Sequence, residues 1–197
     1  MSLADGYSDL PAGKIANVAT FLEMRERASL LPERPGSARS LERLAPPPLD
    51  TYRSLFKRVG APYLWFSRLV MTDEQLGAIV RDPDVEIYLV RERGEEAGLL
   101  ELDFRTRDEC ELVFFGLLQP YIGKGTGRWL MNRAIELAWS HPIRRFWVHT
   151  CTLDHPSALE FYRRSGFTPF KREIEICDDP RLTGVLPRDA APNIPLI

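Results

Sequence analysis

The spacing of apolar and polar residues changes along the chain and predicts several elements. Residues 15–24 are largely apolar and predict a first strand. Asp50 is a candidate N-cap for a short helix over residues 52–59 that Gly60 would close. Thr72 and Gln75 form a capping-box pattern, which predicts a second helix over residues 73–80.

The next part of the chain follows a strand period. Residues 85–90, 97–104 and 109–118 predict three consecutive strands, the first two joined by a turn around Gly94. After a glycine-rich segment the pattern alternates, with a helix at 128–140, a strand at 145–151, a helix at 156–164 and a strand at 168–176. A strand meander followed by β-α-β-α-β predicts an α/β protein with a mixed sheet and helices packed on it.

Prolines divide the chain into regions. Six of the 16 prolines lie in residues 1–48 and four lie in residues 178–197. We therefore expect a long internal loop at 32–48 and an irregular tail at 178–197. The length favours one domain, which we assign to residues 1–177.

Composition excludes several classes of protein. The hydrophobic share of 44% and the charged share of 27% are typical of soluble globular proteins, and the net charge of −2 argues against nucleic-acid binding. No apolar run approaches the length of a membrane span, and the N-terminal segment lacks the features of a signal peptide. The three cysteines are scattered and form no CxxC pair, so we expect a cytoplasmic protein without a disulfide scaffold.

Residues 117–128 carry the strongest chemical signal. Gly123, Gly125 and Gly127 allow backbone N–H groups to face one side, and the helix that follows directs its positive end to the same place. Lys124 and Arg128 add positive charge, so the segment predicts a phosphate or pyrophosphate site. The spacings of the Walker loop and of the dinucleotide fingerprint are both absent. A glycine-rich turn without a ligand is the alternative.

A second segment, residues 153–167, makes that site more specific. Together the two segments resemble the GNAT superfamily of acetyl-CoA-dependent N-acetyltransferases, over about residues 85–177. The cofactor motif of the family, [Q/R]-x-x-G-x-[G/A], is matched by residues 122–127, and its N-x-x-A-x-x-x-Y motif by residues 155–162, followed by Gly166-Phe167. The resemblance implies a GNAT-like fold, with a central, mostly antiparallel twisted sheet, helices on both faces, and a splayed strand pair that holds acetyl-CoA.

The resemblance also implies a set of cofactor-binding residues. Leu117 and Leu118 would offer backbone groups to pantetheine and to the acetyl carbonyl. Two positions depart from the family pattern, because Ile122 stands where Gln or Arg is usual and His155 stands where Asn is usual. The expected cofactor-binding residues are Leu117, Leu118, Gln119, Ile122, Gly123, Lys124, Gly125, Thr126, Gly127, Arg128, His155, Ser157 and Tyr162.

The reaction that the resemblance implies is direct attack of a primary amine on acetyl-CoA in a ternary complex. Tyr162 matches the tyrosine that protonates the coenzyme A sulfur in many relatives, although it is also suited to aromatic packing. Glu111 lies where many relatives place a base, on a strand face that we expect it to share with Glu109, Val113 and Phe115. His149, His155 and a water molecule are rival bases, and Glu111 is equally suited to a solvated position.

Two further residues in this region have more than one interpretation. His149 and Cys151 face the same side of their strand, but two ligands without a third argue against a metal site, so we expect no metal. Cys151 is more simply a core residue than an acyl-carrying nucleophile.

The distribution of charge gives a hint about the acceptor. Residues 84–111 contain ten acids and four arginines, whereas residues 119–147 contain one acid and five bases. A basic arm suits the phosphates of coenzyme A, and an acidic meander would attract a cationic amine, either a small molecule or a peptide. The alternative is that both runs are solvated surface. The aromatic segment 63–68 would either shape the acceptor pocket or pack in the core.

Some alternatives remain open at this point. A non-catalytic acyl-CoA-binding sensor or interaction module, and an acyltransferase that uses another acyl-CoA, both fit the same motifs. The sequence does not decide between a monomer and a homodimer.

Overall fold

The computed structural model describes residues 5–35, 38–44 and 46–197. Residues 1–4, and residues 36, 37 and 45 of the expected loop, lie outside the described residues. In chain order the elements are β1 (Lys14–Met24), β2 (Arg39–Arg43), α1 (Leu49–Gly60), η1 (Ala61–Tyr63), α2 (Asp73–Val80), β3 (Val85–Glu92), β4 (Glu95–Asp103), β5 (Glu109–Leu117), η2 (Gln119–Tyr121), α3 (Thr126–Ala138), β6 (Arg145–Cys151), α4 (Ala158–Arg164) and β7 (Thr168–Asp178).

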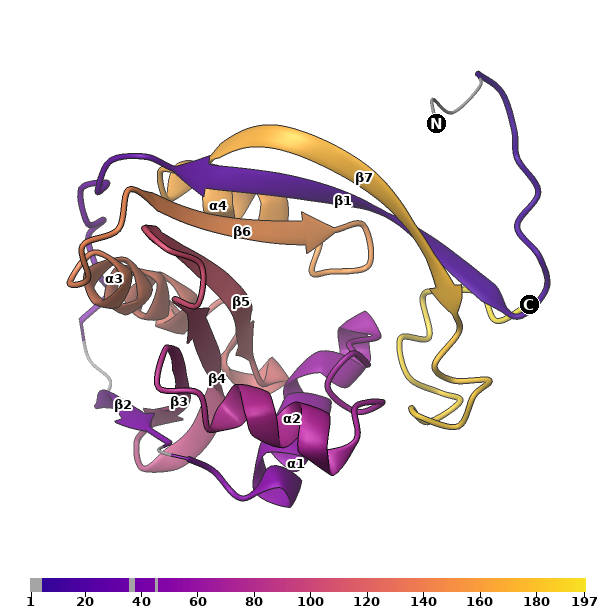
Figure 1. Cartoon of the computed structure of the whole chain (residues 1–197), viewed down its shortest axis with the longest axis horizontal. Helices are drawn as coiled ribbons and strands as arrows, with labels where there is room; N and C mark the ends of the chain where they lie inside the picture. The colour runs from indigo at the N-terminus through magenta and orange to yellow at the C-terminus, as the bar shows by residue number, and fades with distance from the viewer. Residues whose placement is uncertain (1–4, 36–37, 45) are drawn as a thin grey trace.

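The strands form one seven-stranded sheet in the order β2-β3-β4-β5-β6-β1-β7. Every neighbouring pair is antiparallel except β5 and β6, which are parallel. Figure 1 shows β6, β1 and β7 arching together above the strands β3 to β5. The predicted mixed sheet of mostly antiparallel strands is confirmed, and the first strand belongs to it.

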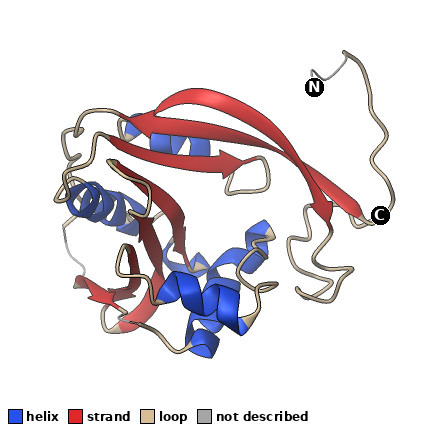
Figure 2. Cartoon of the chain, in the orientation of Figure 1, coloured by secondary structure: helices blue, strands red, loops and turns tan. Residues whose placement is uncertain are grey.

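The helices cover both faces of this sheet, as Figure 2 shows. Helices α1 and α2 pack on one face through a cluster that includes Tyr52, Phe56 and Leu76. Helices α3 and α4 pack on the other face through a cluster that includes Leu130 and Tyr162. Burial of these apolar side chains on two sides is the main force that holds the layers together.

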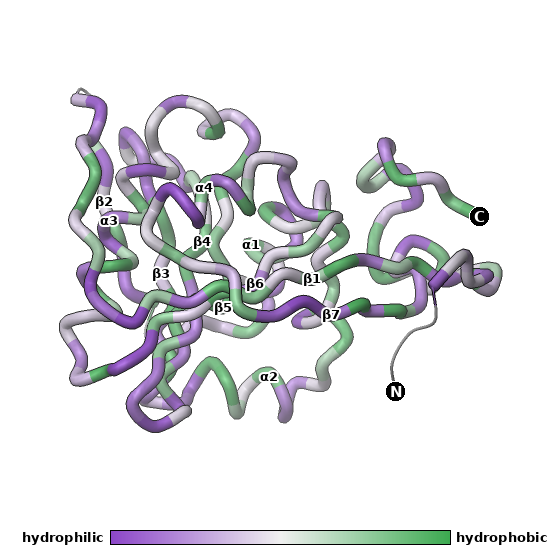
Figure 3. Tube along the Cα trace, turned by 90° about the horizontal axis from the view of Figure 1, so that it is seen from above, coloured by the Kyte–Doolittle hydropathy of each residue, from purple (hydrophilic) through white to green (hydrophobic). Residues whose placement is uncertain are grey.

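The capping box at the start of α2 is confirmed. The Thr72 hydroxyl accepts from the Gln75 N–H at 3.2 Å, and the Gln75 side chain accepts from the Thr72 N–H at 3.0 Å. Apolar and polar residues alternate along this helix in Figure 3, as expected for a helix with one face in the core. No helix within the described residues is long and apolar enough to cross a membrane.

The expected cap of the first helix is wrong. Helix α1 begins at Leu49, and its N-cap is Pro48 rather than Asp50. Pro48 adopts an extended conformation, with φ −56° and ψ 137°, and its carbonyl accepts from the Tyr52 N–H, so the helix starts directly after the proline run. Asp50 lies in the first turn instead, where its charge favours the helix dipole.

The expected loop at 32–48 is interrupted by a strand. Residues 39–43 contain no proline and form β2, which pairs with β3 from Arg39↔Glu92 to Arg43↔Tyr88. The sequence of this strand is mostly charged, which is tolerated because β2 is an edge strand of the sheet. The prolines instead mark the segments on either side of it.

A bulge in β5 changes which residues share its faces. The register with β4 shifts between Glu101↔Phe114 and Leu102↔Leu112, so Val113 is the extra residue. As a result, Phe115 packs with the α3 and α4 cluster on the same side as Leu112. The expectation that Phe115 shares a face with Glu111 is therefore wrong.

The C-terminal segment is irregular, as expected, but it is tightly bonded and packed. Asp179 and Arg181, which are 2% and 3% exposed, form an ion pair with an N–O distance of 2.6 Å. The Arg181 guanidinium also donates to several backbone carbonyls between residues 190 and 195. Leu186 packs beside Ile15 and Leu64, so the segment supports the loop that follows α1. The division at residue 177 stays a prediction, although β7 extends to Asp178.

Candidate active site

A cavity of about 670 Å³ opens where β5 and β6 separate. The two strands pair from Glu109↔Arg145 to Glu111↔Trp147, and beyond that point they diverge, toward the right in Figure 1. The volume is in the range of ordinary small-molecule sites. The splayed strand pair that was expected therefore encloses a site large enough for a ligand.

The glycine-rich loop forms one end of this cavity. Gly123 and Gly125 have φ angles of +77° and +91°, which other residues rarely adopt, and both line the cavity with Gly127 and Ile122. The backbone N–H groups of residues 123–125 donate to no other described residue. Because α3 begins at Thr126, its positive end adds to these free donors. The arrangement suits an anionic ligand.

Buried polar contacts hold the loop from beneath. The Thr126 hydroxyl, which is fully buried, donates to Glu92 at 2.5 Å. Arg39 lies 3.6 Å from the Glu92 carboxylate and donates to the Lys124 carbonyl at 3.3 Å. The buried Thr126 side chain fixes the loop to β3, and the side chain of Lys124 is exposed; neither residue is among those that line the cavity.

Positive side chains gather at the same end. Arg34, Arg128 and Arg164 all line the cavity. Burial and the neighbouring Arg164 lower the pKa of Arg128. Arg128 also lies over the Phe161 ring, 5.0 Å from its centroid, and donates to Ser165. An anion bound here would relieve the repulsion between these guanidinium groups.

Leu118 and Gln119, which were also expected to bind the cofactor, do not line the cavity either. The Leu118 N–H donates to the Ala97 carbonyl and is therefore not free for pantetheine, and the Leu118 carbonyl already accepts one hydrogen bond from the Tyr121 N–H. Its side chain packs with the α1 and α2 cluster. Gln119 donates to the Tyr63 hydroxyl and does not line the cavity. Leu117 does line it, as expected.

Tyr162 lies on the cavity wall, on α4. Its side chain is 7% exposed and packs against the rings of Phe115, Phe161 and Phe167. Burial raises the pKa of its phenol well above the usual value, and the negative charge of Asp154 adds to this effect. The phenol is therefore held in its protonated form, as a proton donor must be.

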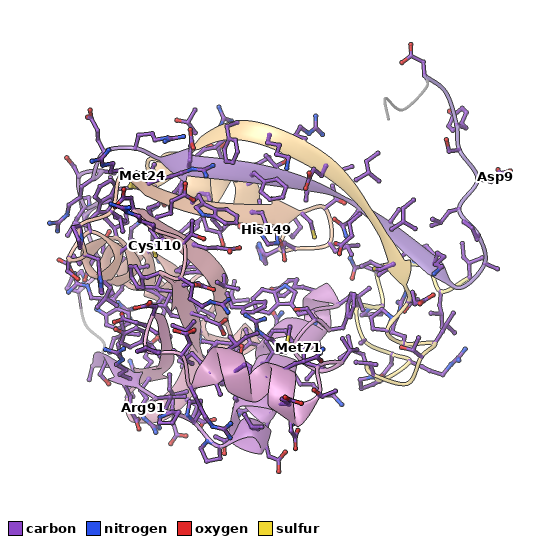
Figure 4. All side chains as sticks on the ribbon, in the orientation of Figure 1. Asp9, Met24, Met71, Arg91, Cys110 and His149 are labelled. Carbon is purple, nitrogen blue, oxygen red and sulfur yellow. The ribbon has the colours of Figure 1, made fainter. Side chains whose placement is uncertain are left out.

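His149 and Glu111 form a pair across β6 and β5. The Nδ1 atom of His149 lies 3.7 Å from the Glu111 carboxylate. This interaction raises the pKa of His149 above its usual value of 6.5. His149 lines the main cavity, whereas Glu111 lines a smaller one beside Asp103 and Trp147. In Figure 4, His149 lies below β6, on the side that faces α1.

His155 is held in one orientation by Ser157. The Ser157 N–H donates to the Nδ1 atom of His155 at 3.2 Å, and the Ser157 hydroxyl lies 2.8 Å from the same atom. Because Nδ1 accepts, the neutral ring carries its proton on Nε2. Both residues line the cavity, and His155 then presents a donor rather than a base.

Asp154 links the aromatic segment after α1 to the end of β6. Its carboxylate accepts from the Trp65 indole at 3.0 Å, the Thr150 hydroxyl at 2.8 Å and the Cys151 N–H at 2.9 Å. Trp65 belongs to the aromatic segment after α1, of which residues 63–67 line the cavity. This segment therefore forms cavity wall as well as core.

The end of the cavity far from the glycine loop is polar and acidic. Asn17 on β1 is 4% exposed, and its amide donates to the Glu175 carboxylate on β7 at 2.8 Å. The Asn17 carbonyl oxygen has no partner among the described residues. No basic side chain in the described chain pairs with Glu175.

Part of the acidic meander is buried and does not contribute a surface charge. Of its ten acids, Glu86, Glu92 and Glu101 are almost fully buried. Glu101 bonds to Arg68 at 2.6 Å and accepts from the Tyr52 hydroxyl. Since burial pairs these acids with arginines or tyrosines, they do not attract a ligand from a distance.

Neither a metal site nor a reactive thiol is evident. Among the residues that the structure describes, no group of three or more His, Cys, Asp or Glu side chains could hold a metal ion. Burial raises the pKa of Cys151 to about 11, so this thiol is a poor nucleophile at neutral pH.

Several cavity residues were missed by sequence reasoning. Asn17 lies on β1, Glu175 lies on β7, and Arg34 lies in the connection after β1. All three are outside both motifs. No local pattern could have identified them, because their positions depend on how distant strands pair. Trp65 lies in the aromatic segment 63–68 and Asp154 lies in the second motif segment, 153–167, but the hydrogen bond between them was not predictable from sequence.

The family model described as "Acetyltransferase (GNAT) family" matches residues 50–167, which is more than half of the chain. This match, together with the seven-stranded mixed sheet, places the chain in a class of α/β acyltransferases. The chain belongs to the GNAT acetyltransferase family. No curated protein matches the sequence.

Solved structures share this fold at low sequence identity. A GCN5-related N-acetyltransferase from Sphaerobacter thermophilus is 16% identical with a TM-score of 0.60, over 83% of this chain and 52% of that chain. An IAA acetyltransferase from Bacillus cereus is 21% identical with a TM-score of 0.52, over 68% and 79%. An aminoglycoside acetyltransferase from an uncultured soil metagenomic sample is 16% identical with a TM-score of 0.52, over 64% and 86%.

The chain spans only part of some neighbours. It covers 63% of a functionally unknown conserved protein from Staphylococcus epidermidis and, as noted, about half of the Sphaerobacter protein. Identities of this size establish a common fold and no more.

Proposed function

We propose that this protein is an N-acetyltransferase that moves an acetyl group from acetyl-CoA to a primary amine by direct attack in a ternary complex. The observation that carries the proposal is the layout of one cavity. A glycine loop with arginines lies at one end, an acidic region lies at the other, and both His149 and Tyr162 line the cavity. Family membership supports an acyltransferase.

The residues present fit coenzyme A. The unused N–H groups of residues 123–125 suit a pyrophosphate, and the gap beyond the Glu111↔Trp147 pair suits an extended pantetheine arm. Leu117 and Phe115 line that gap with apolar surface. When bound, acetyl-CoA would supply the acetyl group as a thioester.

We propose His149 as the general base and Glu111 as its positioning residue. Glu111 holds the Nδ1 side of the ring, which leaves Nε2 to accept the proton that the ammonium must lose before it attacks. The raised pKa of His149 makes it a stronger base. His155 is less suited to this role, because the Ser157 N–H occupies its Nδ1 atom and leaves Nε2 protonated.

Tyr162 is the proposed acid. Its phenol keeps its proton at neutral pH and would deliver it to the departing sulfur, so that free coenzyme A leaves as a thiol. The ammonium loses two protons in one turnover, one to His149 before attack and one from the nitrogen of the tetrahedral intermediate. One of them replaces, through solvent, the proton that Tyr162 gives to the sulfur, and the other is released to solvent.

The acceptor is proposed to be a cationic amine, either a small molecule or an exposed peptide amine. Glu175 and Asp154 lie among the cavity residues, and aromatic side chains of Tyr63, Trp65 and Phe114 surround the same end. Carboxylates and aromatic faces both favour an ammonium group. The solved aminoglycoside acetyltransferase with the same fold gives such amines a place in the test panel.

Release of free coenzyme A thiol from acetyl-CoA, measured over a panel of amines, tests the proposal. The panel would include polyamines, aminoglycosides, amino acids and lysine peptides. We expect release with at least one cationic amine and less with neutral amines. Tight coenzyme A binding without release from any amine would favour a non-catalytic acyl-CoA sensor. Release only from longer acyl-CoA thioesters would favour a different acyl group.

A further inference from the structure

The position of β1 in the sheet forces the chain to cross the cofactor end of the cavity. Strands β1 and β2 are consecutive in sequence, yet β3, β4, β5 and β6 lie between them in the sheet. Five strand spacings of about 4.8 Å each separate the two strands. The connection must span that width, and its described part passes α3 and the glycine loop.

Residues 31–34 of this connection, which we call the strap, are fixed to α3. Asn132, which is 2% exposed, donates to the Leu31 carbonyl and to the Glu33 carboxylate, both at 2.8 Å, and accepts from the Leu31 N–H at 3.3 Å. Arg133 adds an ion pair to Glu33 at 3.0 Å. These contacts hold the strap in a fixed position against α3.

The strap is also joined to the glycine loop. One nitrogen of the buried Arg39 side chain donates to the Arg34 carbonyl at 3.5 Å, and another donates to the Lys124 carbonyl at 3.3 Å. The Arg34 side chain lies directly on Gly125. A Cβ atom at Gly125 would stand 3.1 Å from Arg34 Cδ and 3.3 Å from Arg34 Cβ.

These contacts place the Arg34 side chain beside the glycine loop. It lines the cavity with Arg128, and no carboxylate of the described residues pairs with it. The neighbouring loop residue, Ile122, is apolar and offers no side-chain donor. An arginine fork is well matched to phosphate oxygens, and it lies beside the free N–H groups of the loop.

We propose that Arg34 binds the pyrophosphate of coenzyme A. The strap holds Arg34 at the glycine loop, although Arg34 lies outside the residues that the family model matches. This inference rests on the proposed use of acetyl-CoA. It adds a ligand-binding residue at a position that lies before residues 50–167.

Calorimetric titration of the full chain tests the proposal with three probes, coenzyme A, 3′-dephospho-coenzyme A and pantetheine. We expect Arg34→Ala to weaken binding of both phosphate-containing probes by about tenfold or more, and to leave pantetheine binding unchanged. Arg27→Ala is the matched control, since Arg27 is an exposed arginine of the same connection that does not line the cavity. It should bind all three probes like the wild type.

A double variant distinguishes loss of the guanidinium from a folding defect, because a new arginine at the loop would restore binding only if the protein is folded. Adding Ile122→Arg to Arg34→Ala should restore most of the affinity, because residue 122 also lines the cavity at the loop. Unchanged coenzyme A binding in Arg34→Ala, or an equal loss for pantetheine, would overturn the proposal. A loss confined to coenzyme A would overturn the placement at the pyrophosphate. A wild-type protein that binds no probe would instead overturn the proposed function itself.

Discussion

The imidazole of His149 lies 3.7 Å from the carboxylate of Glu111, although the two residues belong to strands that part just beyond this point. The carboxylate favours the charged imidazolium and so raises the pKa of His149. His149 lines the main cavity and Glu111 lines the smaller one, so the two side chains lie between these two cavities.

The first prediction concerns pH dependence. A base must be neutral to accept a proton, so kcat/KM should rise as pH increases through the raised pKa of His149. Replacing Glu111 with Gln removes the negative charge, so the pKa of His149 should fall and the rising limb should move to lower pH. A full pH profile of kcat/KM for both proteins measures this. A limb that stays in place would exclude His149 as the titrating base.

Direct replacement of the base gives a matched pair of variants. His149→Gln should lower kcat by roughly 10²- to 10⁴-fold while coenzyme A affinity is retained. His155→Asn, which introduces the residue usual in the family, should keep kcat within a few fold, because His155 is placed as a donor. The reverse ranking of the two variants would assign the base to His155.

Tyr162→Phe tests the proton donor. It removes one oxygen from a well-packed ring, so the fold and the coenzyme A affinity should be preserved while kcat falls by roughly 10²-fold or more. Tyr121→Phe is the control, since Tyr121 lies beside the loop but does not line the cavity. Steady-state kinetics and titration of coenzyme A measure both. Equal kcat values for the two variants would leave Tyr162 as a packing residue only.

Gly125→Ala tests the geometry of the loop. The position has φ +91°, where a side chain costs about 1–2 kcal/mol, and the new Cβ would crowd Arg34. Gly94→Ala carries a similar strain at φ +85°, but its Cβ would meet no atom within 4 Å. Gly94→Ala should lose stability through backbone strain alone and Gly125→Ala should lose at least as much, whereas only Gly125→Ala should lose coenzyme A affinity. Equal affinities would show that the loop tolerates the added group.

The buried group around Glu101 should matter for stability. Glu101 is fully buried and bonds to Arg68 and Tyr52. Glu101→Leu leaves the Arg68 charge buried and unpaired, so the free energy of unfolding should fall by about 3–5 kcal/mol. The triple variant Tyr52→Phe, Arg68→Met, Glu101→Leu removes every member and should recover most of that loss. Denaturant unfolding measures both, and a triple variant no better than the single one would contradict the account.

Local patterns predicted the elements well and their arrangement less well. The capping box of Thr72 and Gln75 and the strand period of residues 85–117 depend on neighbours in sequence, so they were readable. The strand at 15–24 was also readable, but its place between β6 and β7 depends on partners more than a hundred residues away. The bulge at Val113 was hidden for the same reason, since it exists only relative to β4.

The site divides in the same way. The glycine loop was predictable because its positive φ angles and helix start are encoded within a few residues. The backbone hydrogen bonds of Leu118 to Ala97 and Tyr121 were not predictable, because the motif alone does not contain these partners. Arg34 and Glu175 reach the cavity through strand order, which periodicity does not specify.

The placement of β1 has a consequence for how the protein assembles. Ala19 pairs with Cys151 on one side and with Glu173 on the other, so β1 leaves the ribosome well before either of its partners exists. Such distant pairings close large loops and slow the folding of a chain. Until β6 and β7 emerge, β1 lacks both of its neighbours in the sheet, so its apolar residues stay open to non-native contacts in the nascent chain.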